Sequence, residues 1–312
     1  MSIQMKKKSM TSSLLLLLAA TIWGVAFVAQ SVGMDYMGPL SFNGARFLLG
    51  GTVLLPLVLV RRKKDKDKKI PRVGAAVTFK GGICCGIALG VASLSQQIGI
   101  QYTTVGKAGF ITTLYIIIVP VMGIFLKKRV SGKVWFGAVI AAIGMYLLCV
   151  NEKLALGRGD AYVFVCAILF AIHILIIDYF SPKADGVELS CIQFFVAGMV
   201  SGVLALIFEK PEISSFINGI VPLAYAGIMS CGVAYTLQII GQKDLDPTVA
   251  SLILSMESVV SMLAGWVILG QALSRKELLG CALVFGAVIL VQLPDKKRIG
   301  GKAQSGETAG GS

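Results

Sequence analysis

Residues Met10–Val32 read MTSSLLLLLAATIWGVAFVAQSV, an apolar run without a charged side chain. Because a helix of about 20 apolar residues crosses the hydrocarbon core of a bilayer, this run predicts a membrane-spanning helix. Nine further apolar runs predict nine further spans: Pro39–Val60, Val73–Ile100, Val105–Leu126, Val134–Val150, Asp160–Phe180, Glu188–Phe208, Ile220–Gln242, Thr248–Gly270 and Glu277–Leu293. Strands of a membrane barrel alternate in hydrophobicity over about 10 residues, whereas these runs are continuous and longer. The sequence therefore predicts an all-α membrane protein with ten transmembrane helices.

The composition places the chain outside the range of soluble domains. Of its 312 residues, 56% are hydrophobic and 14% are charged, whereas soluble domains are about a quarter charged. The net charge of +13 could indicate nucleic acid, but the largest basic run, Arg61–Lys69, lies between two apolar runs. A basic loop between spans is explained by membrane topology. The expected partner is the lipid bilayer and not nucleic acid.

The distribution of Lys and Arg predicts the orientation in the membrane. If the N-terminus is cytoplasmic and ten spans follow, most of these residues fall on the cytoplasmic side. The positive-inside rule then favours a multi-pass protein of the plasma membrane with both termini in the cytoplasm. In this scheme residues 1–9 form the cytoplasmic N-terminus, and residues 294–312, which end in a Gly-rich and Ser-containing stretch, form a flexible cytoplasmic tail.

An internal repeat relates the two halves of the chain. The segment Gly106–Tyr146 is similar to the segment that lies 143 residues later, where Ser131, Lys133 and Gly137 correspond to Ser274, Lys276 and Gly280. Five helices per half is an odd number, so the halves 10–150 and 160–293 are predicted to enter the membrane in opposite directions. Inverted repeats are typical of transporters with a site near the midplane, although any two apolar hairpins share some similarity.

Several short motifs are distinctive when taken together: Ala20–Gly24, Gly38–Phe47, Lys107–Thr112, Val119–Pro120 and Thr248–Glu257. These motifs resemble the EamA-type branch of the drug/metabolite transporter superfamily, and the resemblance covers about residues 10–293. It implies ten helices in two inverted five-helix repeats and the transport, often the export, of small metabolites. The family often carries Glu just after the fourth and ninth helices, where this chain has Lys128 and Gln271.

Two charged residues lie well inside predicted spans, where ionisable groups often mark a transport pathway. Glu257 is close to the midplane of the ninth span, and Ser261 shares its helix face. Glu257 could contact a cation or an amine, take up and release a proton, or tie its helix to a neighbour. Arg46 in the second span could bind a substrate carboxylate, extend outward to the interface, or pair with Asp35.

His173 is the only histidine of the chain, which argues against a metal site with several His ligands. A single buried histidine is either a hydrogen-bonded packing residue or a proton sensor. Glu257 and His173 are therefore the candidates for proton coupling. Tyr235, Gln238 and Gln242 have the spacing i, i+3, i+7 and are expected to share one polar face. Gln96 on the third span is a further candidate for the lining of a cavity. Pro120 is expected to bend or break the fourth span.

The predicted substrate-binding residues are Trp23, Arg46, Gln97, Phe110, Tyr115, His173, Tyr235, Gln238, Glu257 and Ser261.

The sequence contains no phosphate-binding loop, no cluster of metal ligands and no Ser/His/Asp arrangement, so we expect no cofactor, no metal, no catalytic residue and no enzymatic activity. The function that fits these patterns is a secondary transporter that exports a small amino-acid-like or amphipathic metabolite by alternating access. The alternatives are an efflux carrier for cationic amphiphiles and a channel. Either a monomer or a homodimer is compatible with the sequence.

Overall fold

The computed structural model describes residues 3–67, 74–103, 105–127, 130–149, 157–270 and 274–293, and these residues form helices and no strand. The all-α prediction is confirmed. The elements are α1 (Ile3–Gly33), α2 (Pro39–Asp67), α3 (Ala75–Ile100), α4 (Val105–Thr113), α5 (Tyr115–Phe125), α6 (Gly132–Cys149), α7 (Arg158–Phe180), η1 (Ser181–Lys183), α8 (Gly186–Phe208), α9 (Ile213–Asn218), α10 (Ile220–Ala224), the π-helix η2 (Tyr225–Tyr235), α11 (Thr236–Gln242), α12 (Pro247–Leu254), α13 (Met256–Leu269) and α14 (Arg275–Gln292). The predicted tail 294–312, Lys128 and Gln271 lie outside the described residues.

Eight helical stretches of the described part are long and apolar enough to cross a membrane. Two further apolar helices, Gly132–Gly144 within α6 and Leu278–Val291 within α14, are shorter. Large hydrophobic side chains such as Phe208 and Val267 are more than two-thirds exposed, at 71% and 72%. Because soluble proteins rarely expose extended apolar surface, this exterior is suited to contact with lipid.

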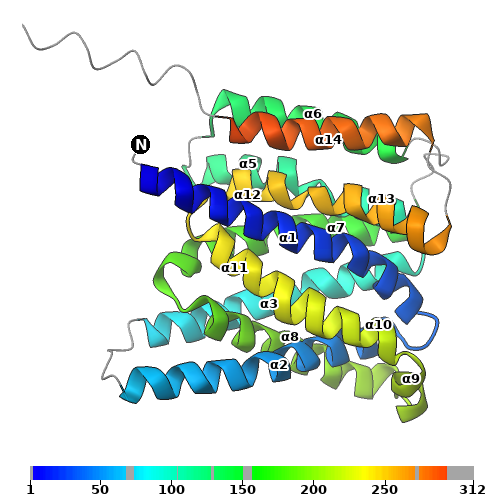
Figure 1. Ribbon diagram of the computed structural model, residues 1–312. Helices are drawn as coiled ribbons and strands as arrows, with labels where there is room; N and C mark the ends of the chain where they lie inside the picture. Colours follow the sequence, from blue (N-terminus) through cyan, green and yellow to red (C-terminus); the bar gives the residue numbers. More distant parts are fainter. Residues whose placement is uncertain are drawn as a thin grey trace, which may run out of the picture.

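The helices lie side by side in a bundle (Figure 1). α6 packs on α14 at one edge of the bundle, and α2 packs on α8 at the opposite edge. Between these two pairs, α1 packs on α13, η2 and α11, and α3 packs on α7. The start of α1 and the end of α14 lie at the same end of the bundle, on the left of Figure 1.

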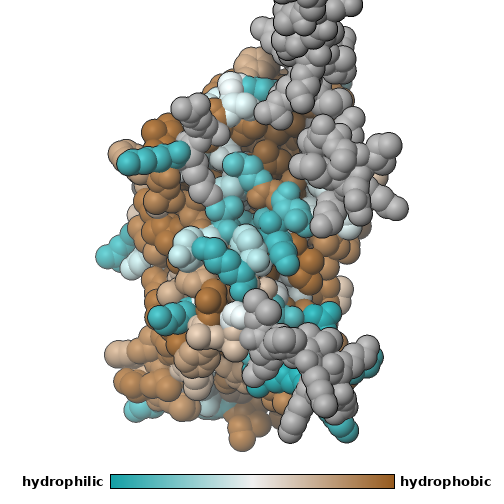
Figure 2. All heavy atoms as spheres, turned by 90° about the vertical axis from the view of Figure 1, so that its left-hand side faces the viewer, coloured by the Kyte–Doolittle hydropathy of each residue, from teal (hydrophilic) through white to brown (hydrophobic). Residues whose placement is uncertain are grey.

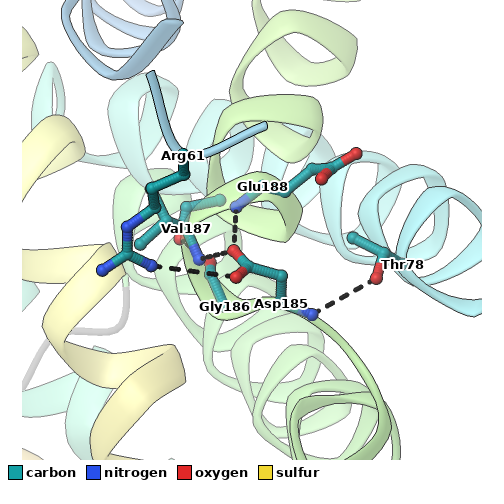
Figure 3. Close-up of polar contacts among 7 residues, drawn as sticks. Arg61, Thr78, Asp185, Gly186, Val187 and Glu188 are labelled. Carbon is teal, nitrogen blue, oxygen red and sulfur yellow. Dashed lines mark hydrogen bonds and ion pairs between the residues drawn. The ribbon is translucent and has the colours of Figure 1, made fainter. Parts of the chain in front are cut away.

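That end carries a concentration of polar groups. In Figure 2 hydrophilic side chains gather in the middle of the end, and hydrophobic side chains cover its flanks. Ion pairs join α2 to α8 through Arg61 with Asp185, at 3.7 Å, and Arg62 with Glu188. Asp185 also caps α8, since its Oδ1 accepts from the backbone N–H of Glu188 at 2.9 Å, and its own N–H donates to Thr78 Oγ1 on α3 (Figure 3).

Single residues interrupt two of the spans: Leu114 separates α4 from α5, and Ser255 separates α12 from α13. Side-chain hydroxyls lie at both interruptions. Thr113 Oγ1 donates to the carbonyl of Gly109 at 3.0 Å, and Ser255 Oγ donates to the carbonyl of Leu252 at 2.7 Å. Hydroxyls that bond to the preceding turn compete with the backbone ladder and bend helices.

The interruption of the fourth predicted span is therefore at Leu114 and not at Pro120, where a bend or break was expected. Pro120 is buried inside α5. A proline removes one backbone hydrogen bond, and α5 stays helical through it while packing against α7 and α12.

Close contact between helices depends on glycine at particular positions. A Cβ atom on Gly24 of α1 would lie 2.9 Å from the carbonyl oxygen of Glu257 on α13. A Cβ atom on Gly44 of α2 would lie 2.9 Å from the backbone of Gly202 on α8, whereas a Cβ atom on Gly202 would meet no heavy atom within 4 Å. The two glycines face each other across one helix contact, but only Gly44 lacks room for a methyl group.

Substitution of these two glycines tests the α2–α8 contact. We expect Gly44→Ala to lower the free energy of unfolding by about 1–3 kcal/mol, because backbone atoms must move to admit the methyl group. Gly202→Ala is the matched control and should be neutral or stabilising, because Ala favours helix by about 1 kcal/mol. The measurement is the melting temperature of each variant in detergent. Equal melting temperatures for the two variants would contradict this packing.

Candidate functional site

A pocket lies among the helices. Helices from both halves of the chain line it, since α1 to α5 contribute as well as α7, η2 and α11 to α13. The lining residues are Trp23, Phe27, Gln30, Arg46, Gln96, Thr112, Tyr115, Phe170, Ile174, Ser230, Tyr235, Gln238, Leu254 and Glu257. One guanidinium and one carboxyl group therefore line a pocket whose other side chains are aromatic, amide, hydroxyl and aliphatic.

Arg46 on α2 supplies the guanidinium, and its side chain is 2% exposed. Its Nη1 donates to Gln30 Oε1 at 2.9 Å, and Gln97 in turn donates from Nε2 to the backbone carbonyl of Gln30 at 3.2 Å. The guanidinium carbon lies 4.8 Å from the centre of the Phe47 ring and 5.8 Å from that of Phe42, both within the range of cation–π attraction. These contacts orient the guanidinium while leaving its buried Nε without a hydrogen-bond partner among the described residues.

The structure narrows the three roles that the sequence left open for Arg46. Its burial is incompatible with extension of the side chain to the membrane interface, and its hydrogen bond goes to Gln30 instead of Asp35. A structural role, in which Gln30 and the two phenylalanine rings hold the guanidinium in place, and a contact with a substrate carboxylate both stay hypotheses. An unpartnered buried N–H on a positively charged group is the donor such a carboxylate requires.

Glu257 supplies the carboxylate and is 5% exposed. Its Oε1 accepts a hydrogen bond from Tyr115 Oη at 2.9 Å. Among the described residues Glu257 and Arg46 line one pocket without forming an ion pair with each other. Two ionisable groups of opposite type are thus held apart in a region of low dielectric constant, where the ionised form of each favours a partner of opposite charge.

Aromatic rings form much of the pocket wall. The Trp23 and Tyr235 rings are tilted against each other with centres 4.5 Å apart. Trp23 Nε1 donates to the backbone carbonyl of Ser230 at 3.3 Å, and Ser230 belongs to the π-helix η2. Segments of π-helix occur often at functional sites. Here η2 contributes both a ring and a backbone acceptor to the pocket.

Amide side chains add hydrogen-bonding capacity. Gln96 donates from Nε2 to Thr112 Oγ1 at 3.2 Å, and the buried Gln238 Oε1 has no partner among the described residues. Gln242 was expected to share the face of Gln238, but it donates to the backbone carbonyl of Ile174 at 3.2 Å and is not part of the lining. Gln238 therefore offers the pocket a free acceptor, and Gln242 is used in packing.

Six of the ten residues expected to bind substrate lie together in the lining: Trp23, Arg46, Tyr115, Tyr235, Gln238 and Glu257. The structure places the other four outside it: Gln97, Phe110, His173 and Ser261. The ring nitrogen Nε2 of His173 is 3.2 Å from Gln193 Oε1, in a contact between α7 and α8. Ser261 Oγ donates to the carbonyl of Ser258 on its own helix, and Phe110 packs against the apolar core. Two of the four contact lining residues: Gln97 donates to the Gln30 carbonyl, and the His173 ring lies edge-on to that of Tyr235 with centres 6.1 Å apart.

Sequence reasoning missed part of the lining. The residues that were not expected are Phe27, Gln30, Thr112, Phe170, Ile174, Ser230 and Leu254. Gln96 was a candidate for the lining but was not among the ten predicted substrate-binding residues. Trp23, Phe27 and Gln30 are spaced four and three residues apart, so helical periodicity could have identified the α1 stripe. Nothing in the sequence distinguishes Phe170 and Ile174 from other apolar residues of the core. Among the described residues no group of three or more His, Cys, Asp or Glu side chains could hold a metal ion.

Comparisons with known proteins identify the family of this chain. The model of the EamA-like transporter family matches residues 10–150 and 157–293. The chain belongs to this family. It is therefore a membrane transporter, and the resemblance seen in its motifs is confirmed.

Relatives of this EamA-like chain are named as transporters. An uncharacterized transporter of Archaeoglobus fulgidus is 29% identical over 292 residues, covering 92% of this chain and 87% of the relative. The uncharacterized inner membrane transporter YedA of Escherichia coli is 22% identical, covering 87% of each chain. A solved crystal structure with 18% identity has a TM-score of 0.73 and covers 90% of this chain and 96% of its own, which shows a shared fold.

The hydrogen bond between Arg46 and Gln30 can be tested without a ligand. We expect Gln30→Leu to lower the free energy of unfolding by about 1–3 kcal/mol, because the buried guanidinium loses its acceptor. The exposed Gln101→Leu makes the same chemical change away from the pocket and should have little effect. Melting temperatures in detergent provide the comparison. Unchanged stability of Gln30→Leu would mean that the guanidinium does not depend on Gln30.

Proposed function

We propose that this EamA-like transporter is a secondary carrier that moves a small zwitterionic, amino-acid-like or amphipathic metabolite by alternating access. The observation that carries the proposal is the placement of Arg46 and Glu257, which are both buried and line one pocket without pairing with each other. A substrate with a carboxylate and an ammonium group complements both charges at once. The guanidinium matches a carboxylate through parallel N–H donors, and a carboxylate accepts from an ammonium.

The proposed architecture is ten spans in two inverted five-helix repeats. The two family matches support it, because they divide the chain into halves of similar length. The chain directions in Figure 1 also support it: α1 runs away from the end that holds the N-terminus and α7 runs toward it, and α2 and α8 are likewise opposed. α6 and α14 would be the fifth span of each repeat. A pocket lined from both repeats is the arrangement from which transporters rock one half against the other.

The proposed setting is the plasma membrane, with both termini cytoplasmic and with transport directed outward. Basic residues support this orientation, since Arg61, Arg62, Lys63, Lys64 and Lys183 lie near the end of the bundle that holds the N-terminus. A second substrate class is favoured by a specific observation. Aromatic rings beside Glu257 could also bind a cationic amphiphile through cation–π contacts.

Counterflow in proteoliposomes tests the carrier mechanism. We expect liposomes loaded with unlabelled phenylalanine to accumulate labelled phenylalanine transiently and saturably, because a carrier exchanges bound substrate across the membrane. Liposomes without protein are the control. Conductance steps in planar bilayers would instead indicate a channel. Counterflow of nucleotide sugars alone would overturn the zwitterionic substrate class.

Glu257→Gln tests the role of the carboxylate. The amide keeps the shape and can still accept from Tyr115, but it carries no charge for an ammonium. We therefore expect the substrate concentration for half-maximal exchange to rise about tenfold or more, with a parallel loss of pH-gradient-driven transport. The exposed Glu212→Gln is the matched control and should transport normally.

Two other outcomes would contradict this assignment. Loss of pH-gradient-driven transport with normal exchange at equal pH would show that Glu257 carries a proton instead of contacting the substrate. Normal transport in both assays by well-folded Glu257→Gln would leave only a bracing role between helices.

A further inference from the structure

Tyr115 and Glu257 both lie close behind the interruption of a span. Tyr115 is the first residue of α5, directly after the interruption at Leu114, and Glu257 is the second residue of α13, two residues after the interruption at Ser255. Their hydrogen bond of 2.9 Å joins the first half of the chain to the second inside the pocket. Both side chains are almost fully buried, at 3% and 5% exposure.

Among the described residues, the Glu257 carboxylate has one side-chain hydrogen-bond donor, the Tyr115 hydroxyl. A buried carboxylate without a donor is strongly unfavourable, so this hydroxyl stabilises the pocket when no substrate is bound. A hydroxyl contributes a single neutral hydrogen bond. An ammonium group offers three donors and a positive charge, and charge-assisted bonds are roughly twice as strong as neutral ones.

We propose that the Tyr115 hydroxyl is a stand-in for the substrate's ammonium group, which displaces it from Glu257 on binding. Tyr115 is then a specificity-determining residue, because a ligand without an ammonium group cannot displace the hydroxyl at a gain in free energy. The inference rests on the proposed function for the existence of a zwitterionic substrate in this pocket. Beyond that function, it identifies the Tyr115 hydroxyl as the group that competes with the substrate's ammonium group for Glu257.

Two neighbouring features fit this assignment. Gln238 presents a buried Oε1 without a partner in the same lining and provides a second acceptor for the incoming ammonium. Arg46 also lies in the lining and is already bonded to Gln30, so the carboxylate end of a substrate has a separate, pre-oriented position. Displacement of Tyr115 also breaks a direct link between α5 and α13, and thereby connects occupancy of the pocket to the freedom of the two halves to move.

The test uses three ligands of similar shape and two tyrosine variants of the full-length protein in detergent. Phenylalanine has both charged groups, phenethylamine has only the ammonium, and 3-phenylpropanoate has only the carboxylate. Dissociation constants are measured by isothermal titration calorimetry.

For Tyr115→Phe we expect phenylalanine and phenethylamine to bind about five- to tenfold more tightly than they bind to the wild type, because the competing hydroxyl is gone. The affinity for 3-phenylpropanoate should not change. Tyr225→Phe is the matched control, since Tyr225 donates to the carbonyl of Ile22 outside the lining, and it should leave all three constants unchanged.

A double-mutant cycle separates competition from any general effect of the substitution. If Tyr115 acts only through Glu257, adding Tyr115→Phe to Glu257→Gln should produce no tightening for the two amines. Weaker binding of the amines to Tyr115→Phe would overturn the proposal, because it would show that the hydroxyl contacts the ligand or only maintains the pocket. The same tightening for 3-phenylpropanoate would overturn it as well.

Failure of the proposed function is recognised separately, in the wild-type protein. If the wild type binds none of the three ligands, the zwitterionic substrate class is wrong and this inference falls with it. If the wild type binds 3-phenylpropanoate but neither amine, the pocket binds an anion. That result would overturn the ammonium site at Glu257 but not the carboxylate site at Arg46. Should Tyr115→Phe fold poorly, Tyr115→Leu is the second variant that lacks the hydroxyl, and the proposal requires that it also bind the two amines more tightly relative to 3-phenylpropanoate.

Discussion

Polar groups that a protein places inside the bilayer depend on partners within the protein, because the hydrocarbon core supplies no water. The helices satisfy the backbone in this way. Side chains are satisfied less completely, and the two ionisable groups of the pocket are the most demanding of them. Arg46 is held by Gln30 and two phenylalanine rings, and Glu257 is held by Tyr115. Keeping an ionised side chain in this pocket costs free energy, and a ligand of opposite charge would reduce that cost.

The hydroxyl side chains at the two interruptions of the spans are also hydrogen-bonded within the protein. Thr113 and Ser255 return their hydroxyls to the preceding turn of helix, and each lies next to or at the point where a span is interrupted. The residues that follow the interruptions are the ones that meet in the pocket, Tyr115 and Glu257. Local competition between side chain and backbone is therefore connected to the geometry of the candidate site. The π-helix η2 contributes similarly by supplying Tyr235 and the Ser230 carbonyl.

Rigid contacts and exchangeable contacts occupy different parts of the bundle. α2 and α8 meet through the tight approach at Gly44, and ion pairs at one end hold them together. By contrast, the link between α5 and α13 inside the pocket includes a single hydrogen bond to a group that a ligand could replace. A carrier needs both kinds of contact, since one maintains the fold and the other responds to occupancy of the pocket.

The sequence by itself determined the all-helical fold, the membrane environment and the family, because apolar length and charge composition depend on the solvent and not on the neighbours of each residue. It also identified Arg46, Glu257, Trp23, Tyr115, Tyr235 and Gln238 as residues to consider, since polar and aromatic groups inside apolar runs are conspicuous. Only the tertiary structure decided which of these meet. It separated His173 and Ser261 from the pocket, moved the interruption from Pro120 to Leu114, and brought Phe170 and Ile174 into the wall. The reason is that a pocket is formed by residues far apart in the chain, and their distances are set by how helices pack and not by spacing along any one helix.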